Sequence, residues 1–176
     1  TISKALDCGI HGVQIPNIEN KTEIDNIRKF SKFPPIGKRG FSPFTRASNY
    51  SSIYSDDFVK KTNDKLLNII HIENKEGLEN IDEILEQDDI DIVFIGLFDL
   101  SMMLNLPGKI DHQEVLDSFS LLAKKVIASK KILGSIATRA NQINFLAEHS
   151  VRYLTFSADC QLINDTYNQI FTSIKE

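Results

Sequence analysis

Residues 66–101 read LLNIIHIENKEGLENIDEILEQDDIDIVFIGLFDLS, and this stretch decides the fold. It opens with a continuous apolar run at residues 66–73 and reaches a second, β-branched run at residues 90–96. Between them, apolar residues of the segment 78–85 recur at i, i+3 and i+7, the spacing of one helix face. Short apolar runs that alternate with amphipathic helices are typical of βαβ units. The stretch therefore predicts neighbouring parallel strands that are buried on both faces.

The same alternation continues on both sides of this stretch. We expect further strands near residues 12–16, 131–137 and 153–158, which makes five strands in all. About six helices accompany them, including one opened by Thr22 and one with Asp111 as its N-cap. Such a chain is α/β, and its parallel sheet fits either an open doubly wound sheet or part of a (β/α) TIM-type barrel. The hydrophobic pattern alone does not choose between them.

Length and composition exclude several classes of protein. The chain has 176 residues, of which 41% are hydrophobic and 25% charged, as in one folded domain and unlike a disordered chain. A net charge of -4 and scattered basic residues argue against a nucleic-acid partner. The apolar runs are far shorter than the roughly 20 residues that span a bilayer, so we expect no membrane partner and a cytoplasmic location. Cys8 and Cys160 lack the spacing of a zinc site, and we expect both to be buried.

Two acidic side chains follow the two strands of the opening stretch. Glu73 is the last residue of the first run, and Asp99 lies just beyond the second. The carboxyl ends of parallel strands share one edge of the sheet, where ligand sites form in both candidate folds. Two converging carboxylates suit a hard cation such as Mg²⁺, which also keeps water and substrate ligands. The alternative is structural: Glu73 is a solvated acid, and Asp99 is the N-cap of a short helix.

His71 stands two residues before Glu73, so their side chains share one face of the strand. If Glu73 faces the site, His71 lies beneath it and could hydrogen-bond a metal-bound water or ligand. The alternative is a core histidine that is paired with the backbone.

Arg39 and Arg46 flank a polar loop within residues 33–65. A loop arginine could bind a carboxylate in a bidentate manner, although surface positions and loop tethering are commoner roles. The sequence contains no P-loop, no GxGxxG after a strand and no GxSxG elbow. These absences disfavour enzymes that cradle phosphates and oxidoreductases that depend on dinucleotides.

Four segments together resemble the HpcH/HpaI class II aldolases, with citrate lyase β-type proteins as more distant relatives. The resemblance covers nearly the whole chain, and its most specific part is an IE strand end followed by an IGxxDLS strand end. The segments are ALDCGIHGVQIPNIENKTEID (5–25), PPIGKRGFSPFTRAS (34–48), NIIHIENKEGLENIDEIL (68–85) and DIDIVFIGLFDLS (89–101).

This resemblance implies a (β/α) barrel whose Glu73 and Asp99 bind a divalent metal, Mg²⁺ or alternatively Mn²⁺ or Co²⁺. The backbone N–H groups of Phe98 and Asp99 would hold the substrate carboxylate. Asp7 would reach the site of a neighbouring subunit and support a catalytic histidine there, which implies a homo-oligomer, typically a hexamer built as a trimer of dimers. His71 departs from the family, which usually has Gln at this position, and is a second candidate catalytic residue.

The implied reaction is reversible aldol cleavage of a hydroxy-2-oxo acid to pyruvate, or a similar 2-oxo acid, and an aldehyde through a metal-stabilised enolate. The alternatives are a citrate-forming or acyl-CoA lyase-type enzyme of the same family and a truncated, non-catalytic barrel.

The resemblance also implies a limit on what the chain contains. The family's base histidine and pyruvate-binding arginine lie before the region matched, and a barrel usually needs about 250 residues. We therefore expect residues 1–176 to form a single partial barrel domain. It would correspond to the C-terminal two-thirds of the family barrel, with the last five βα units, and its first residue, Thr1 rather than Met, fits that expectation.

Overall fold

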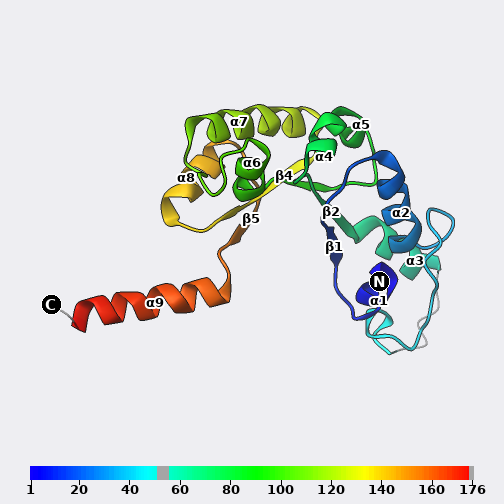
Figure 1. The fold of residues 1–176 in the computed structure, drawn as a ribbon. Helices are drawn as coiled ribbons and strands as arrows, with labels where there is room; N and C mark the ends of the chain where they lie inside the picture. Colours follow the sequence, from blue (N-terminus) through cyan, green and yellow to red (C-terminus); the bar gives the residue numbers. More distant parts are fainter. Residues whose placement is uncertain (51–55, 175–176) are drawn as a thin grey trace.

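A computed structural model describes residues 1–50 and 56–174 of the chain. Within them, strands and helices alternate as the sequence predicts, although the described residues form nine α-helices where about six were expected (Figure 1). The strands are β1 (Gly12–Ile15), β2 (Leu67–His71), β3 (Ile92–Phe94), β4 (Ile132–Ala137) and β5 (Tyr153–Phe156). The helices are α1 (Ile2–Asp7), α2 (Lys21–Ser31), α3 (Asp56–Lys65), α4 (Lys75–Glu79), α5 (Ile81–Leu85), α6 (Leu97–Met103), α7 (Gln113–Ala128), α8 (Ala140–Glu148) and α9 (Asp159–Ile174), with a 3-10 turn η1 (Arg46–Ser48).

The five strands form one parallel sheet in the order β1-β2-β3-β4-β5. A doubly wound sheet reverses its strand order at a switch point, whereas a barrel adds strands in sequence around a curve. The sequential order and the arch that the sheet forms in Figure 1 therefore identify a half-barrel. The expectation of a partial TIM-type barrel is confirmed.

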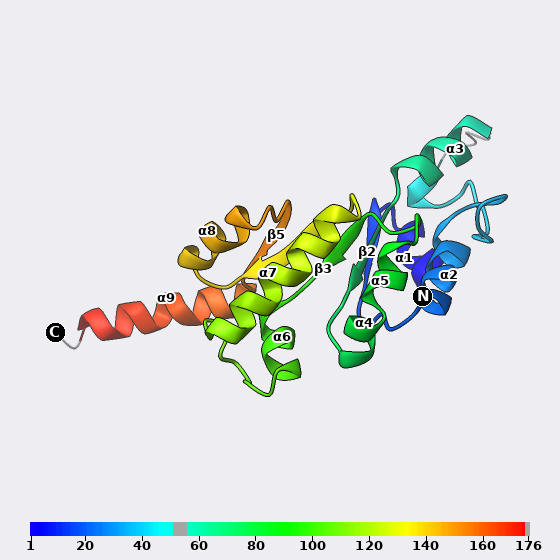
Figure 2. The same cartoon turned by 90° about the horizontal axis from the view of Figure 1, so that it is seen from above.

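The two faces of the sheet are covered differently. Ile70, Val93 and Leu133 point outward into the main core beneath the helices, together with Phe119 of α7. Figure 2 shows α5 and α7 lying along this outer face. The alternate residues of the same strands point to the inner, concave face, where a smaller cluster is centred on Phe94. The concave face is the one that carries Glu73.

Three helix boundaries differ from those expected. The segment around residues 78–85 forms α4 and α5, two short helices that meet at Asn80, instead of one helix. The side chain of Asn20, not Thr22, caps α2 by accepting a hydrogen bond from the backbone of Glu23. His112, not Asp111, is the N-cap of α7.

The polar segment of residues 33–65, expected to be a loop, includes the helix α3 and is also attached to its surroundings. Residues 51–55 lie outside the described residues, and the part before them is fastened to α3 and α1. The side chain of Asn63 in α3 pairs with both the N–H and the carbonyl of Phe33. Arg39 is 3% exposed and ion-paired with Asp7. The loop-tethering role considered for Arg39 is therefore the one observed.

The structure contradicts one expectation about the cysteines. Cys8 and Cys160 are both exposed, so the prediction that they are buried is wrong. Cys8 follows the short helix α1, and Cys160 lies on α9, which packs against no part of the core. Within residues 1–50 and 56–174, no helix combines the length and apolar character needed to cross a bilayer.

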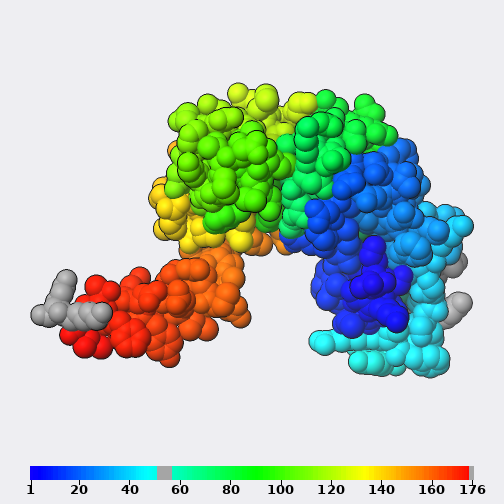
Figure 3. Space-filling view, viewed as in Figure 1, coloured from blue at the N-terminus to red at the C-terminus, as the bar shows by residue number. Residues whose placement is uncertain are grey.

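The last helix, α9, projects away from the half-barrel (Figure 2). None of its residues is buried, although it carries an apolar stripe. Figure 3 shows the result: α9 and the α1 region form the two sides of a hollow beneath the arch. Since α9 does not fold back over β5, Leu154 and Phe156 on the outer face of that strand remain 39% and 46% exposed.

Candidate functional site

Glu73 and Asp99 follow neighbouring strands at the carboxyl end of the half-barrel. Glu73 comes shortly after β2, and Asp99 lies in the first turn of α6, which begins directly after β3. Gly96 is the N-cap of α6, so the alternative that Asp99 caps this helix is wrong. A Cβ atom at Gly96 would stand 2.6 Å from Asp99 Oδ2, so this glycine leaves room for the carboxylate.

The charges of the two carboxylates interact. Burial raises the pKa of Asp99, and the negative charge of Glu73 raises it further. The backbone N–H of Asp99 and the neighbouring His71 act in the opposite direction with smaller effect. Asp99 therefore lies close enough to Glu73 for the two negative charges to repel each other.

Glu73 is held by hydrogen bonds to both carboxylate oxygens. The backbone N–H of Asn17 donates to Oε1 at 3.0 Å, and His71 Nδ1 pairs with Oε2 at 3.0 Å. The Glu73 side chain is 17% exposed and the His71 side chain is 20% exposed. His71 and Glu73 thus share one face of the strand as predicted. Because His71 pairs with side chains, the alternative of a core histidine bound to the backbone is wrong.

Two residues of this site were not found from the sequence. The other ring nitrogen of His71, Nε2, contacts Nε2 of Gln14 on β1, and Gln14 Oε1 accepts a hydrogen bond of 3.0 Å from the Tyr153 hydroxyl on β5. Gln14 is a polar residue at an inward position of an otherwise apolar strand, which is the signal that could have found it. Tyr153 carries no such signal in the sequence.

Aromatic rings support this group from below. The His71 ring stacks on Phe94 with centroids 4.5 Å apart, and Tyr153 meets Phe94 edge to face at 6.2 Å. A Cβ atom at Gly134 would stand 3.0 Å from a ring carbon of each of Phe94 and Tyr153. The absence of a side chain at Gly134 therefore lets both rings occupy the concave face.

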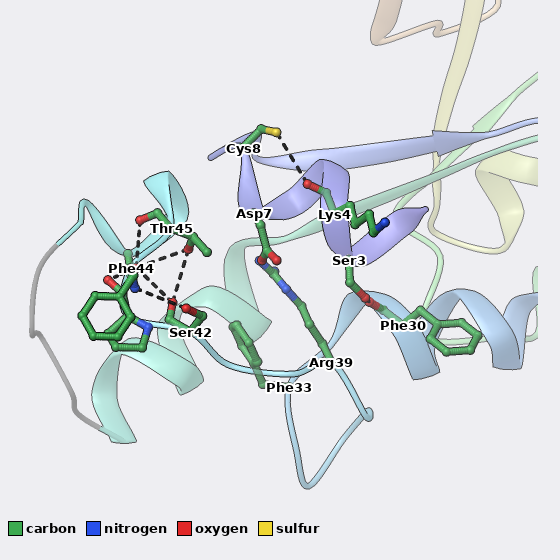
Figure 4. A network of polar contacts seen from close by, with 12 residues as sticks. Ser3, Lys4, Asp7, Cys8, Phe30, Phe33, Arg39, Ser42, Phe44 and Thr45 are labelled. Atoms are coloured by element: carbon green, nitrogen blue, oxygen red, sulfur yellow. Dashed lines mark hydrogen bonds and ion pairs between the residues drawn. The ribbon is translucent and has the colours of Figure 1, made fainter.

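Asp7 lies at the other end of the half-barrel. It ends α1, before the amino end of β1, and its carboxylate accepts a 2.8 Å hydrogen bond from Arg39 Nη2 (Figure 4). The Arg39 guanidinium also lies 4.5 Å from the centroid of the Phe33 ring. Arg46, the other loop arginine, is exposed. The structure does not bring Asp7 and Glu73 of one chain together, so a role for Asp7 in a neighbouring subunit stays a prediction.

The turn expected to hold a substrate carboxylate is the start of α6. The first N–H groups of a helix have no acceptor within the helix, and those of Phe98 and Asp99 belong to this set. The Phe98 side chain is 43% exposed at the same place. The carboxylate-binding role of these two backbone groups stays a prediction.

Comparisons with known proteins agree on one family. The sequence model described as HpcH/HpaI aldolase/citrate lyase matches residues 1–164. The chain is 28% identical over 175 residues to a protein named 2-keto-3-deoxy-L-rhamnonate aldolase from Escherichia coli O6:K15:H31, and 27% identical to the protein of that name from Shigella sonnei. Each alignment covers 99% of this chain and 65% of the relative, so the chain spans about two-thirds of the relatives' length.

Solved structures show the same fold. An HpcH/HpaI aldolase from Desulfitobacterium hafniense matches with a TM-score of 0.92 and 23% identity, over 99% of this chain and 68% of the other. An HpcH/HpaI aldolase/citrate lyase family protein from Burkholderia cenocepacia matches with a TM-score of 0.88 and 22% identity, over 99% and 69% of the two chains.

Proposed function

The chain belongs to the HpcH/HpaI aldolase/citrate lyase family, and we propose that the protein is a metal-dependent aldolase, a carbon–carbon lyase. It would cleave a hydroxy-2-oxo acid reversibly to pyruvate, or a similar 2-oxo acid, and an aldehyde, as the name of the rhamnonate aldolase relatives suggests. The observation that carries the proposal is the placement of two carboxylates, Glu73 and Asp99, after the adjacent strands β2 and β3 of the half-barrel. We also propose that the protein is located in the cytoplasm.

The residues present fit a divalent cation. The negative charges of Glu73 and Asp99 repel each other, so a cation between them would stabilise both carboxylates. Their oxygen ligands suit Mg²⁺, Mn²⁺ or Co²⁺. Among the described residues, no group of three or more His, Cys, Asp or Glu side chains has a metal-binding arrangement. The proposed protein ligands are therefore Glu73 and Asp99 alone, with waters and substrate oxygens as the rest. A bound cation would stabilise the negative charge that develops on the substrate keto oxygen.

The other groups would bind and orient the substrate. The N–H groups of Phe98 and Asp99, at the positive end of a helix, would hold its carboxylate. Both ring nitrogens of His71 are engaged, with Gln14 and Glu73, which favours positioning over proton transfer. Asp7 keeps a side chain that is 37% exposed despite its ion pair, as the proposed contact with a neighbouring subunit requires.

Self-association is part of the proposal. The exposed apolar residues of α9 form a stripe on a helix without one buried residue: Leu162, Ile163, Tyr167, Ile170, Phe171 and Ile174. An exposed apolar helix face of this kind is typical of protein interfaces. We propose that another copy of the chain covers it in a homo-oligomer, with the family's trimer of dimers as the expected assembly.

Proton exchange tests the proposed chemistry. The protein should accelerate exchange of the pyruvate methyl protons with deuterated water in the presence of Mg²⁺, and a chelator should remove the effect, as followed by proton NMR. Glu73→Gln should reduce the accelerated rate by at least about 100-fold, because one of two metal ligands loses its charge. Glu79→Gln, which makes the same change on exposed α4, serves as the control. Undiminished exchange in Glu73→Gln would contradict the assignment.

A further inference from the structure

We propose that Tyr153 and Gln14 are positioning residues that act through His71 to hold the Glu73 carboxylate in one orientation. The inference rests on the proposed function in one respect, that Glu73 is the expected metal ligand. Its basis is a hydrogen-bonded chain of four side chains on the concave face, in which the two edge strands β1 and β5 contribute Gln14 and Tyr153.

The donor and acceptor roles of the four side chains allow only one direction of hydrogen bonding, from the Tyr153 hydroxyl to the Glu73 carboxylate. An ionised carboxylate only accepts hydrogen bonds, so the hydrogen between His71 and Glu73 is on Nδ1 of the imidazole. In that tautomer Nε2 is an acceptor, and it receives a hydrogen from the amide nitrogen of Gln14. The amide oxygen then points the other way and accepts from the hydroxyl of Tyr153. Each group therefore has a single role from Tyr153 to Glu73.

The chain ends on a carboxylate with two fixed bonds. Oε2 accepts from His71 and Oε1 accepts from the backbone of Asn17, which leaves an acceptor position on each oxygen for a ligand. The donors come from β2 and from the segment after β1, so the carboxylate cannot rotate without breaking one of them. Partners that orient a ligating carboxylate in this way typically change metal affinity by 10- to 100-fold.

The packing contacts of Tyr153 involve its ring and not its hydroxyl group. The Tyr153 ring is held against Phe94 and beside Gly134, and neither contact involves the hydroxyl. Tyr153→Phe therefore removes one hydrogen bond and leaves the aromatic contacts in place. Gln14→Glu keeps the shape of the side chain and an acceptor for Tyr153, but it removes the donor to His71.

Nitrogen-15 NMR of the imidazole rings shows directly which ring nitrogen carries a hydrogen. We expect the His71 hydrogen on Nδ1 in the wild-type protein. In Gln14→Glu, carboxylates face both ring nitrogens, so we expect a hydrogen on Nε2 as well as on Nδ1. A wild-type hydrogen on Nε2, or no change at Nε2 in the variant, would overturn the proposal, because a role in packing alone would not change the hydrogen on that nitrogen.

Titration with Mn²⁺ alone, followed by electron paramagnetic resonance, measures the effect on Glu73. Tyr153→Phe should weaken Mn²⁺ binding by about 10-fold, whereas Tyr50→Phe, at a 71% exposed position outside the concave face, should leave it unchanged. Equal affinities of Tyr153→Phe and wild type would overturn the positioning role. If the wild-type protein binds no Mn²⁺, the proposed function fails. The NMR comparison then still decides whether the hydrogen bonds from Tyr153 and Gln14 hold His71 in the proposed tautomer.

Discussion

Single side chains set the charge balance at the carboxyl ends of β2 and β3. Burial and the charge of Glu73 raise the pKa of Asp99 above its value in an unfolded chain. The folded protein therefore binds a proton at Asp99 more tightly than the unfolded protein does. A cation between the two carboxylates would reverse this preference, since it favours the ionised forms.

This pKa shift predicts how stability depends on pH in metal-free buffer. The contribution of Asp99 is fully present below the unfolded pKa of 3.8 and is lost as the pH rises through the higher folded pKa. Asp99→Asn should flatten the fall in unfolding free energy over this range. It should also raise Tm at neutral pH by on the order of 1 °C, a small gain because the group is half-buried.

Thermal unfolding followed by circular dichroism from pH 3.5 to pH 7, in the presence of a chelator, measures both effects. Asp117→Asn, on an exposed position of α7, controls for the change of charge. An unchanged pH profile in Asp99→Asn would show that Asp99 does not carry the unfavourable charge.

The sequence was sufficient for the residues whose placement depends on local geometry. Glu73 and His71 share a face because strand side chains alternate, and Asp99 follows the neighbouring strand. Gln14 and Tyr153 were missed because their contact depends on how strongly the whole sheet curves, which no local pattern encodes. The cysteines were misplaced for a similar reason, since the exposure of Cys160 follows from the direction of α9.

Elements were predicted well in kind and less well at their ends. All five strands occur where expected, each shorter by one or more residues at one or both ends, which is the usual uncertainty of such boundaries. At the junction of α4 and α5, the Asn80 side chain donates a 2.8 Å hydrogen bond to the carbonyl of Glu19, which is distant along the chain. A periodic apolar pattern contains no information about such a contact.

Arg39 links the loop after α2 to α1 through its ion pair with Asp7. Arg39→Met keeps an unbranched apolar side chain over Phe33 but removes the ion pair with Asp7. Because half-exposed Asp7 can regain water, we expect a loss of about 1–3 kcal/mol in unfolding free energy. Chemical denaturation measures it, with Lys38→Met, at an exposed neighbouring position, as the control. Equal losses in both variants would contradict a specific role for the ion pair.

At the scale of the whole molecule, the choice between a barrel and a doubly wound sheet lies in strand order. Both folds use the same βα units, so the alternation of elements predicted either. The sequential order β1 to β5 is a property of how the units assemble, and only the structure shows it. The exposed outer face of β5 and the lack of buried residues in α9 also follow from how the whole molecule is assembled.

The apolar stripe of α9 predicts the behaviour of the protein in solution. We expect a mass that is a multiple of 19.9 kDa in size-exclusion chromatography with light scattering. Ile170→Asp should shift the mass toward that of one chain, because it places a charge in the stripe. Gln169→Asp, at the neighbouring exposed position, should not. A monomeric wild-type protein would contradict the proposed self-association.

The sequential strand order also bears on the time course of folding. Every backbone pairing joins strands that follow one another along the chain, so each step closes only one connecting segment. The bond between Gln14 and Tyr153 spans 139 residues and can form only once all five strands are assembled. In stopped-flow measurements, Tyr153→Phe should therefore speed unfolding and leave the refolding rate nearly unchanged. The hydrogen-bonded chain that orients Glu73 would then also lengthen the lifetime of the folded arch.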